Sequence, residues 1–158
     1  MERMPITKAG FDTLKARLKH IKEVERPQNI EDIETARAHG DLSENAEYHA
    51  AREKQSVLTA QLHDLEDKIS RAEVIDPSDV ADKSKAVFGA TVTVYDINSE
   101  EENAYQIVGD VETNVEEGKI GISSPLARAI LGKMECDEIR VKTPGGLREL
   151  EIVKIEYK

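Results

Sequence analysis

The sequence of 158 residues is poor in cysteine and in aromatic residues, with one Cys, no Trp and an aromatic content of 4%. The single cysteine, Cys136, cannot close an intrachain disulfide. No apolar run approaches the roughly 18 residues of a membrane-spanning helix, and no hydrophobic signal segment follows Met1. We therefore expect a cytoplasmic protein without a membrane partner. Its core must consist of Leu, Ile, Val and Ala, which favours long helices over one large globule.

Positive charge is also scarce, because 22 Lys and Arg residues face 32 Asp and Glu residues and the formal net charge is −10. Proteins that gain affinity from bare DNA or RNA phosphates do so with Lys and Arg residues that displace counterions. The acidic balance argues against that class of protein. A role on nucleic acid should therefore depend on a protein partner.

Short motifs that reveal most enzyme classes are absent. The sequence has no glycine-rich nucleotide loop, no GxSxG, no HExxH and no CxxC pair. None of the four histidines lies beside a candidate nucleophile in the sequence, and the acidic neighbours of Cys136 disfavour its thiolate. The sequence therefore offers no self-contained catalytic site of these classes.

The first half of the chain has the periodicity of amphipathic helices. Gly40 is a typical helix stop and Asp41 a typical helix cap, so the chain should turn back at this point. We predict an antiparallel coiled-coil hairpin with helices over residues 8–39 and 42–74. The predicted apolar seam consists of Phe11, Leu14, Leu18 and Ile21 in the first helix and Ala51, Gln55, Leu58, Leu62, Leu65, Ile69 and Ala72 in the second.

Two features should modify this hairpin along its length. An interior proline costs about 3 kcal/mol, so Pro27 predicts a kink near residues 24–26. Small residues should make the hairpin slim near its turn, because they let the helices approach closely but bury little area. These small seam residues are Ala36, Ala46, Ala50 and Ala51.

The second half changes period at about Asp76, where Asp76, Pro77, Ser78 and Asp79 read as a turn and linker. A short helix should begin after Ser124 and stop at Gly132. One helix on a mostly antiparallel sheet predicts a small α+β domain over residues 80–158, separate from the hairpin at residues 1–75. The predicted strands are residues 90–95, 103–108, 118–122, 138–143 and 150–155.

The candidate site is the turn of the hairpin, where Asp41 and Glu44 are three residues apart. This spacing fits a capping box, in which both carboxylates accept hydrogen bonds from free backbone N–H groups. The same two carboxylates fit half of a magnesium site, since Mg²⁺ is usually held by one or two carboxylates together with waters and phosphates. Spacing alone leaves both interpretations open.

Five segments of the sequence carry a family resemblance, namely residues 36–53, 87–92, 107–110, 124–129 and 142–146. They resemble the bacterial transcript cleavage factors of the Gre family, and the match covers essentially the whole chain. The resemblance implies an N-terminal hairpin that enters the secondary channel of RNA polymerase. It also implies a C-terminal domain, similar to FK506-binding proteins, that docks at the channel's rim.

The resemblance further implies that the chain stimulates the polymerase to cleave backtracked RNA and is not itself the enzyme. Asp41 and Glu44 would help to hold a second Mg²⁺ in the polymerase active site, whereas the free protein would bind no metal tightly. Arg37, Arg52 and Lys54 would contact the extruded 3′ end of the nascent RNA. The residues expected to orient the tip against the channel wall are Ser43, Asn45 and Tyr48.

Three rival functions are compatible with the sequence. The first is a regulator that occupies the same channel without promoting cleavage, and the second is a coiled-coil adaptor in which the tip acids are only caps. The third is a prolyl isomerase, since the C-terminal domain should share that fold. Peptide pockets of this type are lined by aromatic residues, which are few after Asp76, and a shared fold alone does not transfer activity. The aromatic residues in question are Phe88, Tyr95, Tyr105 and Tyr157.

Overall fold

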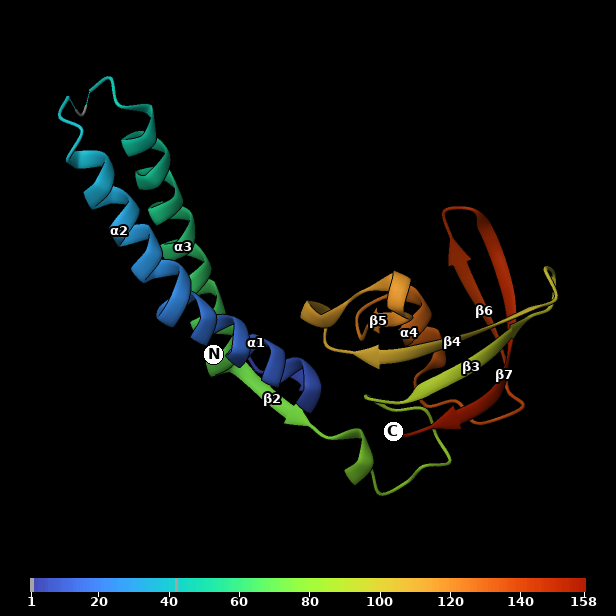
Figure 1. The fold of residues 1–158 in the computed structure, drawn as a ribbon. Coiled ribbons are helices and arrows are strands. Elements are labelled where there is room, and N and C mark those ends of the chain that lie inside the picture. Colours follow the sequence, from blue (N-terminus) through green and yellow to red (C-terminus); the bar gives the residue numbers. More distant parts are fainter. Residues whose placement is uncertain (1, 42) are drawn as a thin grey trace. The chain divides into compact units, whose positions relative to one another are not determined.

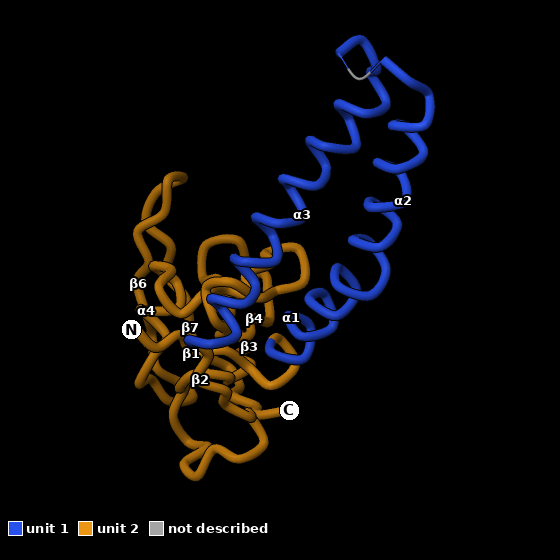
Figure 2. Tube along the Cα trace, turned by 90° about the vertical axis from the view of Figure 1, so that its left-hand side faces the viewer, with its two compact units in different colours: residues 1, 11–71 blue, residues 2–10, 72–158 orange. Residues whose placement is uncertain are grey.

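The computed structural model describes residues 2–41 and 43–158, which form two compact units (Figure 2). The hairpin unit consists of residues 11–71, and the sheet unit consists of residues 2–10 and 72–158. The α+β fold class is therefore confirmed. Residues 2–10 and 72–75 group with the sheet unit, whereas the sequence-based division had placed them in the hairpin half.

The hairpin unit has a first arm in three consecutive helical pieces and a second arm in one (Figure 1). The second arm was predicted to begin at residue 42, which lies outside the described residues, but its helix begins only at Ala46 and ends before residue 74. The pieces are α1 at Lys8–His20, a π-helical segment at Ile21–Glu25, α2 at Arg26–Arg37, and α3 at Ala46–Arg71.

The base half of the hairpin, which lies on the side of the π segment away from the turn, is held by the predicted apolar seam. The buried residues of this seam form a cluster of Ile21, Leu58, Leu62 and Leu65. Leu14 and Leu18 of α1 pack against this cluster. Regular heptad spacing continued from Ile21 would reach positions 25, 28, 32 and 35.

The π segment shifts this seam by one residue. Beyond it the buried positions are Asn29, Ile33 and Ala36, each one residue later than the heptad predicts. The Arg26 N–H donates to the Ile21 carbonyl in the i→i−5 pattern of a π-helix, which accommodates one extra residue in a turn. The irregularity expected near residues 24–26 is this segment, followed by Pro27 in the first turn of α2.

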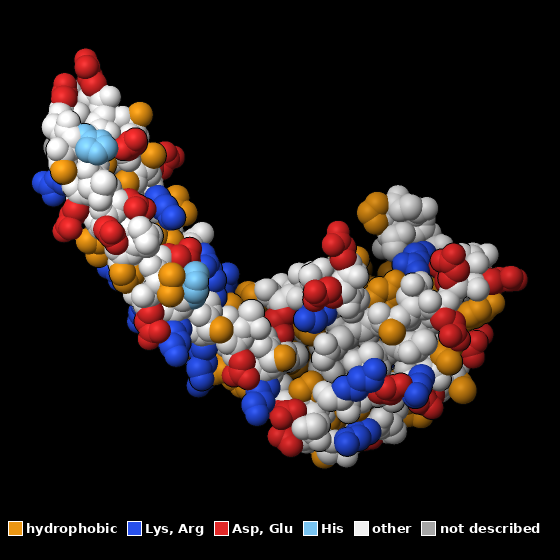
Figure 3. All heavy atoms as spheres, in the orientation of Figure 1, with side chains coloured by type: hydrophobic (Ala, Val, Ile, Leu, Met, Phe, Trp, Pro, Cys, Tyr) orange, Lys and Arg blue, Asp and Glu red, His pale blue; other side chains and the backbone are white. Residues whose placement is uncertain are grey.

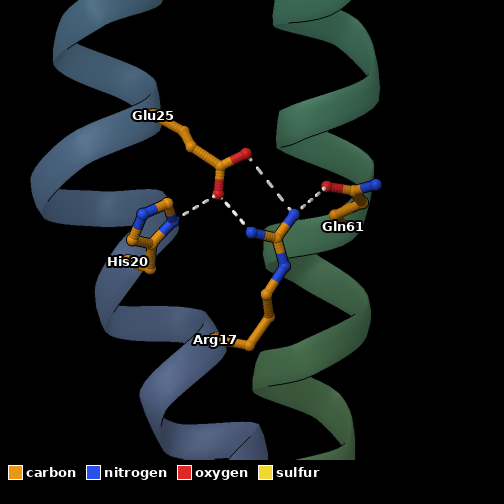
Figure 4. A network of polar contacts seen from close by, with 4 residues as sticks. All are labelled: Arg17, His20, Glu25 and Gln61. Carbon is orange, nitrogen blue, oxygen red and sulfur yellow. Dashed lines mark hydrogen bonds and ion pairs between the residues drawn. The ribbon is translucent and has the colours of Figure 1, made fainter.

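A polar network crosses the two arms at the π segment (Figure 4). The Glu25 carboxylate accepts hydrogen bonds from Arg17 and from His20, whose Nδ1 lies 2.8 Å from Oε2. Arg17 Nη2 also donates to Gln61 of α3 at 3.3 Å. The His20 hydrogen bond is the main reason that the pKa of Glu25 lies below its ordinary value. The network therefore joins α1 and the π segment to the opposite arm.

In the tip half of the hairpin, between the π segment and the turn, the two helices are held by their close approach and by one buried side-chain amide. The Asn29 side chain is 2% exposed, and its Nδ2 donates to the Ala51 carbonyl across the seam at 2.9 Å. Ala36 and Ala51 are buried, as predicted, but Ala46 and Ala50 are exposed, so the small-residue seam is shorter than expected.

The sheet unit is a five-stranded sheet in the order β5-β4-β3-β7-β6, with α4 at Pro125–Ile130 packed against it. All five predicted strands form, and neighbouring strands are antiparallel except for the parallel pair β4 and β5. The strands are β3 at Thr91–Asp96, β4 at Glu101–Val108, β5 at Lys119–Gly121, β6 at Glu138–Thr143 and β7 at Gly146–Glu156.

The short helix of the sheet unit begins and stops as predicted. The Ser124 Oγ accepts the N–H of Ala127 at 3.2 Å, which caps α4, and Gly132 adopts φ +80° after its end. Ala127 and Ile130 place α4 in the core of this unit. That core also contains strand residues such as Val92, Val94, Ile107, Ile139, Val141, Leu150 and Ile152.

The sheet unit also contains two short parallel strands that were not predicted, β1 at Met4–Thr7 and β2 at Ala72–Ile75. The Glu112 carboxylate accepts the N–H groups of Thr7 at 3.0 Å and Gly109 at 2.7 Å, which ties β1 to the rest of the sheet unit. A side chain at Gly109 would come within 2.3 Å of the Pro5 carbonyl. The remaining short elements are 3-10 turns at Pro77–Asp79, Asp110–Glu112 and Val115–Glu117.

Candidate functional site

The tip of the hairpin is the connection between the end of α2 and the start of α3. Helix α2 ends at Arg37, and the chain then makes two tighter turns in which His39 N–H donates to Ala36 O and Gly40 N–H donates to Arg37 O. Gly40 has φ +104°, a conformation that favours glycine, so it allows the chain to leave the helix here. Asp41 follows directly after this glycine, and Glu44 lies three residues farther along the chain.

Asp41 orders the tip through one of its two carboxylate oxygens. Its Oδ1 accepts the Ser43 N–H at 3.0 Å and the Ser43 hydroxyl at 2.8 Å, which closes an Asx turn. Among the residues that the structure describes, no group donates to its Oδ2. Glu44 is exposed and forms no hydrogen bond or ion pair within the described ranges. Three carboxylate oxygens at the tip are therefore unbonded there.

Of the two interpretations of the tip acids, the capping box of Asp41 and Glu44 does not form in the structure, because the cap of α3 is Asn45. The Asn45 Oδ1 accepts the Tyr48 N–H at 3.0 Å, which is the contact of an N-cap residue with the third helical residue. Its Nδ2 donates to the Ala36 carbonyl at 2.7 Å. One amide side chain thus caps the second arm and binds the end of the first.

Histidine and tyrosine side chains surround this turn. The rings of Tyr48 and His49 meet edge to face with centroids 5.8 Å apart, and His49 Nε2 lies 3.2 Å from the Ser43 carbonyl. A carbonyl accepts only, so this contact requires a proton on Nε2. His39 Nδ1 lies 3.5 Å from Glu47 Oε2. The sequence did not predict a role for His39 or His49, because no recognisable catalytic or metal-binding motif surrounds either of them.

The three predicted basic residues lie on the two arms near the tip. Arg37 is the last residue of α2, whereas Arg52 and Lys54 lie in the second and third turns of α3, and all three are exposed. Lys54 lines a small groove between the arms together with Asp32 and Glu47. Figure 3 shows acidic side chains at the outermost end of the hairpin, with basic side chains farther along it.

The tip suits a hard cation but offers it few ligands. Asp41 and Glu44 supply carboxylate oxygens, which Mg²⁺ prefers, but Mg²⁺ takes about six oxygen ligands in octahedral geometry. Across residues 2–41 and 43–158, no group of three or more His, Cys, Asp or Glu residues is placed to hold a metal ion. The chemistry of the two acids therefore fits only part of a magnesium site.

None of the helices in the described ranges has the length and apolar character needed to span a membrane.

The chain is similar in sequence to known transcription elongation factors. Transcription elongation factor GreA of Hyphomonas neptunium is 52% identical over 158 residues, with 100% of both chains covered. Transcription elongation factor GreA of Bartonella tribocorum is 55% identical, with 99% of both chains covered. The crystal structure of GreA factor homolog 1 (Gfh1) of Thermus thermophilus is 27% identical, with 98% and 99% coverage and a TM-score of 0.44.

Family models match both halves of the chain. Residues 4–74 match the family described as "Transcription elongation factor, N-terminal". Residues 81–157 match the family described as "Transcription elongation factor, GreA/GreB, C-term". These matches cover nearly all of the hairpin unit and most of the sheet unit. The chain therefore belongs to the GreA/GreB family of transcription elongation factors.

Proposed function

We propose that this chain places the end of its hairpin in the secondary channel of RNA polymerase and stimulates the polymerase to cleave backtracked RNA. Membership of a family of transcription elongation factors supports RNA polymerase as the partner. The observation that carries the proposal is the pair of exposed carboxylates, Asp41 and Glu44, at the end of an arm that is only two helices thick. Such an arm can bring carboxylates to an active site that lies deep in another protein.

The tip acts on a metal shared with the polymerase. Mg²⁺, when bound, activates a water for attack on the RNA phosphodiester and stabilises the leaving oxygen. The Ser43 contacts hold the Asp41 carboxylate through Oδ1 and leave Oδ2 available to a ligand. Asn45 fixes the turn from which both acids project. The polymerase supplies the remaining ligands and remains the catalyst.

The residues around the two acids bind the RNA and orient the tip. Arg37, Arg52 and Lys54 carry positive charge near the tip, where they attract the phosphates of the extruded 3′ end of the nascent RNA. Ser43, Asn45 and Tyr48 orient the tip against the channel wall, since their hydrogen bonds already fix the turn in the free chain. The sheet unit docks at the channel's rim, so that binding and chemistry reside in different parts of the molecule.

The test separates charge from structure with the substitutions Asp41→Asn and Glu44→Gln. Asn at position 41 still accepts the Ser43 N–H, so the turn is kept while the carboxylate is lost. We expect RNA cleavage in stalled polymerase complexes to fall to the level of polymerase alone. Affinity for polymerase, measured by competition, should stay close to that of the parent.

Glu53→Gln is the matched control, because Glu53 is an exposed acid of α3 that lies outside the turn and outside the proposed RNA contacts. It should cleave as the parent does. Unchanged cleavage in the Asp41 and Glu44 variants would overturn the proposal. A parent protein that binds polymerase without stimulating cleavage would identify the chain as a regulator that only occupies the channel.

A further inference from the structure

A groove on the base half of the hairpin unit takes no part in the chemistry proposed for the tip. It has a volume of about 590 Å³ and lies along α1, the π segment and the last turn of α3. Apolar and basic side chains line it together. The apolar ones are Phe11, Ala16, Leu18 and Ile69, and the basic ones are Lys15, Lys19 and Lys22.

The side chains that line this groove carry more positive than negative charge. The Lys22 ammonium lies 3.5 Å from Glu66, and the Lys15 ammonium lies 5.2 Å from the centre of the Phe11 ring. Within the described part of the chain, neither Lys15 nor Lys19 pairs with a carboxylate. Glu23 is the single acid of the lining. On a chain with a net charge of −10, this is a local basic surface around an apolar centre.

We propose that the groove binds an acidic segment of RNA polymerase that inserts an apolar side chain between the lysines. The inference depends on the proposed function, since it takes the polymerase as the partner. An acidic chain is repelled by an acidic partner over most of its surface, so a complementary basic groove determines where such a segment can approach. Burial of an apolar side chain against the apolar lining then stabilises the complex.

The same features favour a protein segment over RNA. Phosphates pair with lysines, but a sugar–phosphate backbone gains little from Leu18 and Ile69. Bases stack on aromatic rings, yet the one aromatic ring of the lining, Phe11, already has the Lys15 ammonium over its face. An amphipathic acidic segment satisfies both the lysines and the apolar residues.

The first test neutralises the charge of the groove with the double substitution Lys15→Gln and Lys19→Gln in the full chain. Affinity for polymerase should fall roughly tenfold, with a weaker dependence on salt. The matched control is Lys68→Gln with Arg71→Gln, which removes the same charge from the same unit outside the groove. That control should bind within about twofold of the parent, and equal losses in both variants would overturn the proposal.

The second test fills the groove without a change of charge. Ala16 is exposed, lines the groove and lies in α1, so Ala16→Gln adds a helix-compatible side chain into the space. Binding should weaken here too, while cleavage at saturating factor stays at the parent level. Parent-like binding of Ala16→Gln would overturn the apolar insertion. This loss of binding without loss of cleavage also distinguishes the groove from the tip, because the tip variants should lose cleavage and keep binding.

The third test identifies the occupant with a photoreactive lysine analogue at position 19 in the purified complex. The expected product joins the groove to a polymerase peptide with more Asp and Glu than Lys and Arg and with an apolar residue near the attachment point. A product with RNA, a product with a basic polymerase peptide, or no product at all would overturn the proposal.

Discussion

The hairpin unit and the sheet unit are stabilised in different ways. The sheet unit has a two-layer core in which α4 packs against a sheet that includes strands β3, β4, β6 and β7. The hairpin unit has one seam, whose apolar part in the base half is the four-residue cluster around Ile21. A thin seam keeps the arm narrow but gives each seam residue a large share of the stability. The unit that carries the two tip acids is therefore the more vulnerable of the two.

The contrast continues within the hairpin. The base half buries branched apolar side chains, whereas the tip half combines Ile33 with small residues and with two side-chain amides that bind backbone carbonyls. Hydrogen bonds between specific atoms fix the register of two helices more strictly than apolar contact does. The tip half thus gains a defined alignment with little added width.

The largest effect on stability is expected from truncation in the base seam. Leu62 is 7% exposed and belongs to the seam cluster, so Leu62→Ala should lower the free energy of unfolding of the hairpin by about 2 to 5 kcal/mol. Val57 is 50% exposed on the same helix, and Val57→Ala serves as the control with little loss. Denaturation followed by helical circular dichroism measures both. Similar losses in the two variants would show that the seam does not carry the stability.

A smaller loss is expected in the tip half from Asn29→Ala. The substitution removes the buried hydrogen bond to the Ala51 carbonyl and should cost about 1 to 3 kcal/mol. Gln28→Ala is the control, because Gln28 is the exposed neighbour whose side chain donates to Asp32 of its own helix. Cleavage stimulation should fall more than stability alone explains if Asn29 aligns the tip. A variant with unchanged stability would refute the role of the amide in the seam.

Much of the fold could be predicted because its signals are local. Periodicity found both arms, β-branched runs found all five strands of the large sheet, and Ser124 with Gly132 bounded α4. The strands β1 and β2 were missed because each has four residues and pairs with a segment far along the chain. The shift of the seam by one residue is visible in the positions of Asn29 and Ile33, but Pro27 alone predicts a kink and not an inserted residue.

The tip shows where local pattern fails. Asp41 and Asn45 are both good caps, and Asp41 with Glu44 even has the spacing of a capping box. The deciding contact is the hydrogen bond from Asn45 to the Ala36 carbonyl, which depends on how the two arms meet and not on spacing in one segment. The metal role of the acids came from family resemblance and stays a prediction.

Acid should destabilise the sheet unit through Asp96. Its carboxylate accepts the N–H groups of Ser99 and Asn98 and pairs with Arg148, and these contacts, chiefly that with Ser99, lower its pKa. A lowered folded-state pKa means that its stabilisation is present above the ordinary value near 3.8 and is lost as the pH falls through the folded value.

We therefore expect the sheet unit of the parent to lose more stability than that of Asp96→Asn as the pH falls from about 5 toward about 2. Thermal unfolding followed by tyrosine fluorescence measures this, since three of the four tyrosines, Tyr95, Tyr105 and Tyr157, lie in the sheet unit. Asp79→Asn is the control, because Asp79 is an exposed acid of the same unit. Parallel pH profiles of parent and Asp96→Asn would contradict the assignment.

The smallest expected effect concerns Mg²⁺ and the free protein. Two carboxylates give Mg²⁺ only part of its oxygen shell, and the ion gives up its waters reluctantly, so the tip alone should not compete with water. Calorimetry should detect no tight binding, and millimolar Mg²⁺ should leave the unfolding temperature of the hairpin unchanged, because a ligand stabilises only in proportion to its occupancy. Incubation with naked RNA should yield no cleavage.

The Asp41→Asn protein, titrated in parallel, gives the baseline for non-specific binding to an acidic chain. Tight binding that Asp41→Asn abolishes, or RNA hydrolysis without polymerase, would show that the two acids form a self-contained site and that the hairpin does not need the polymerase to complete it.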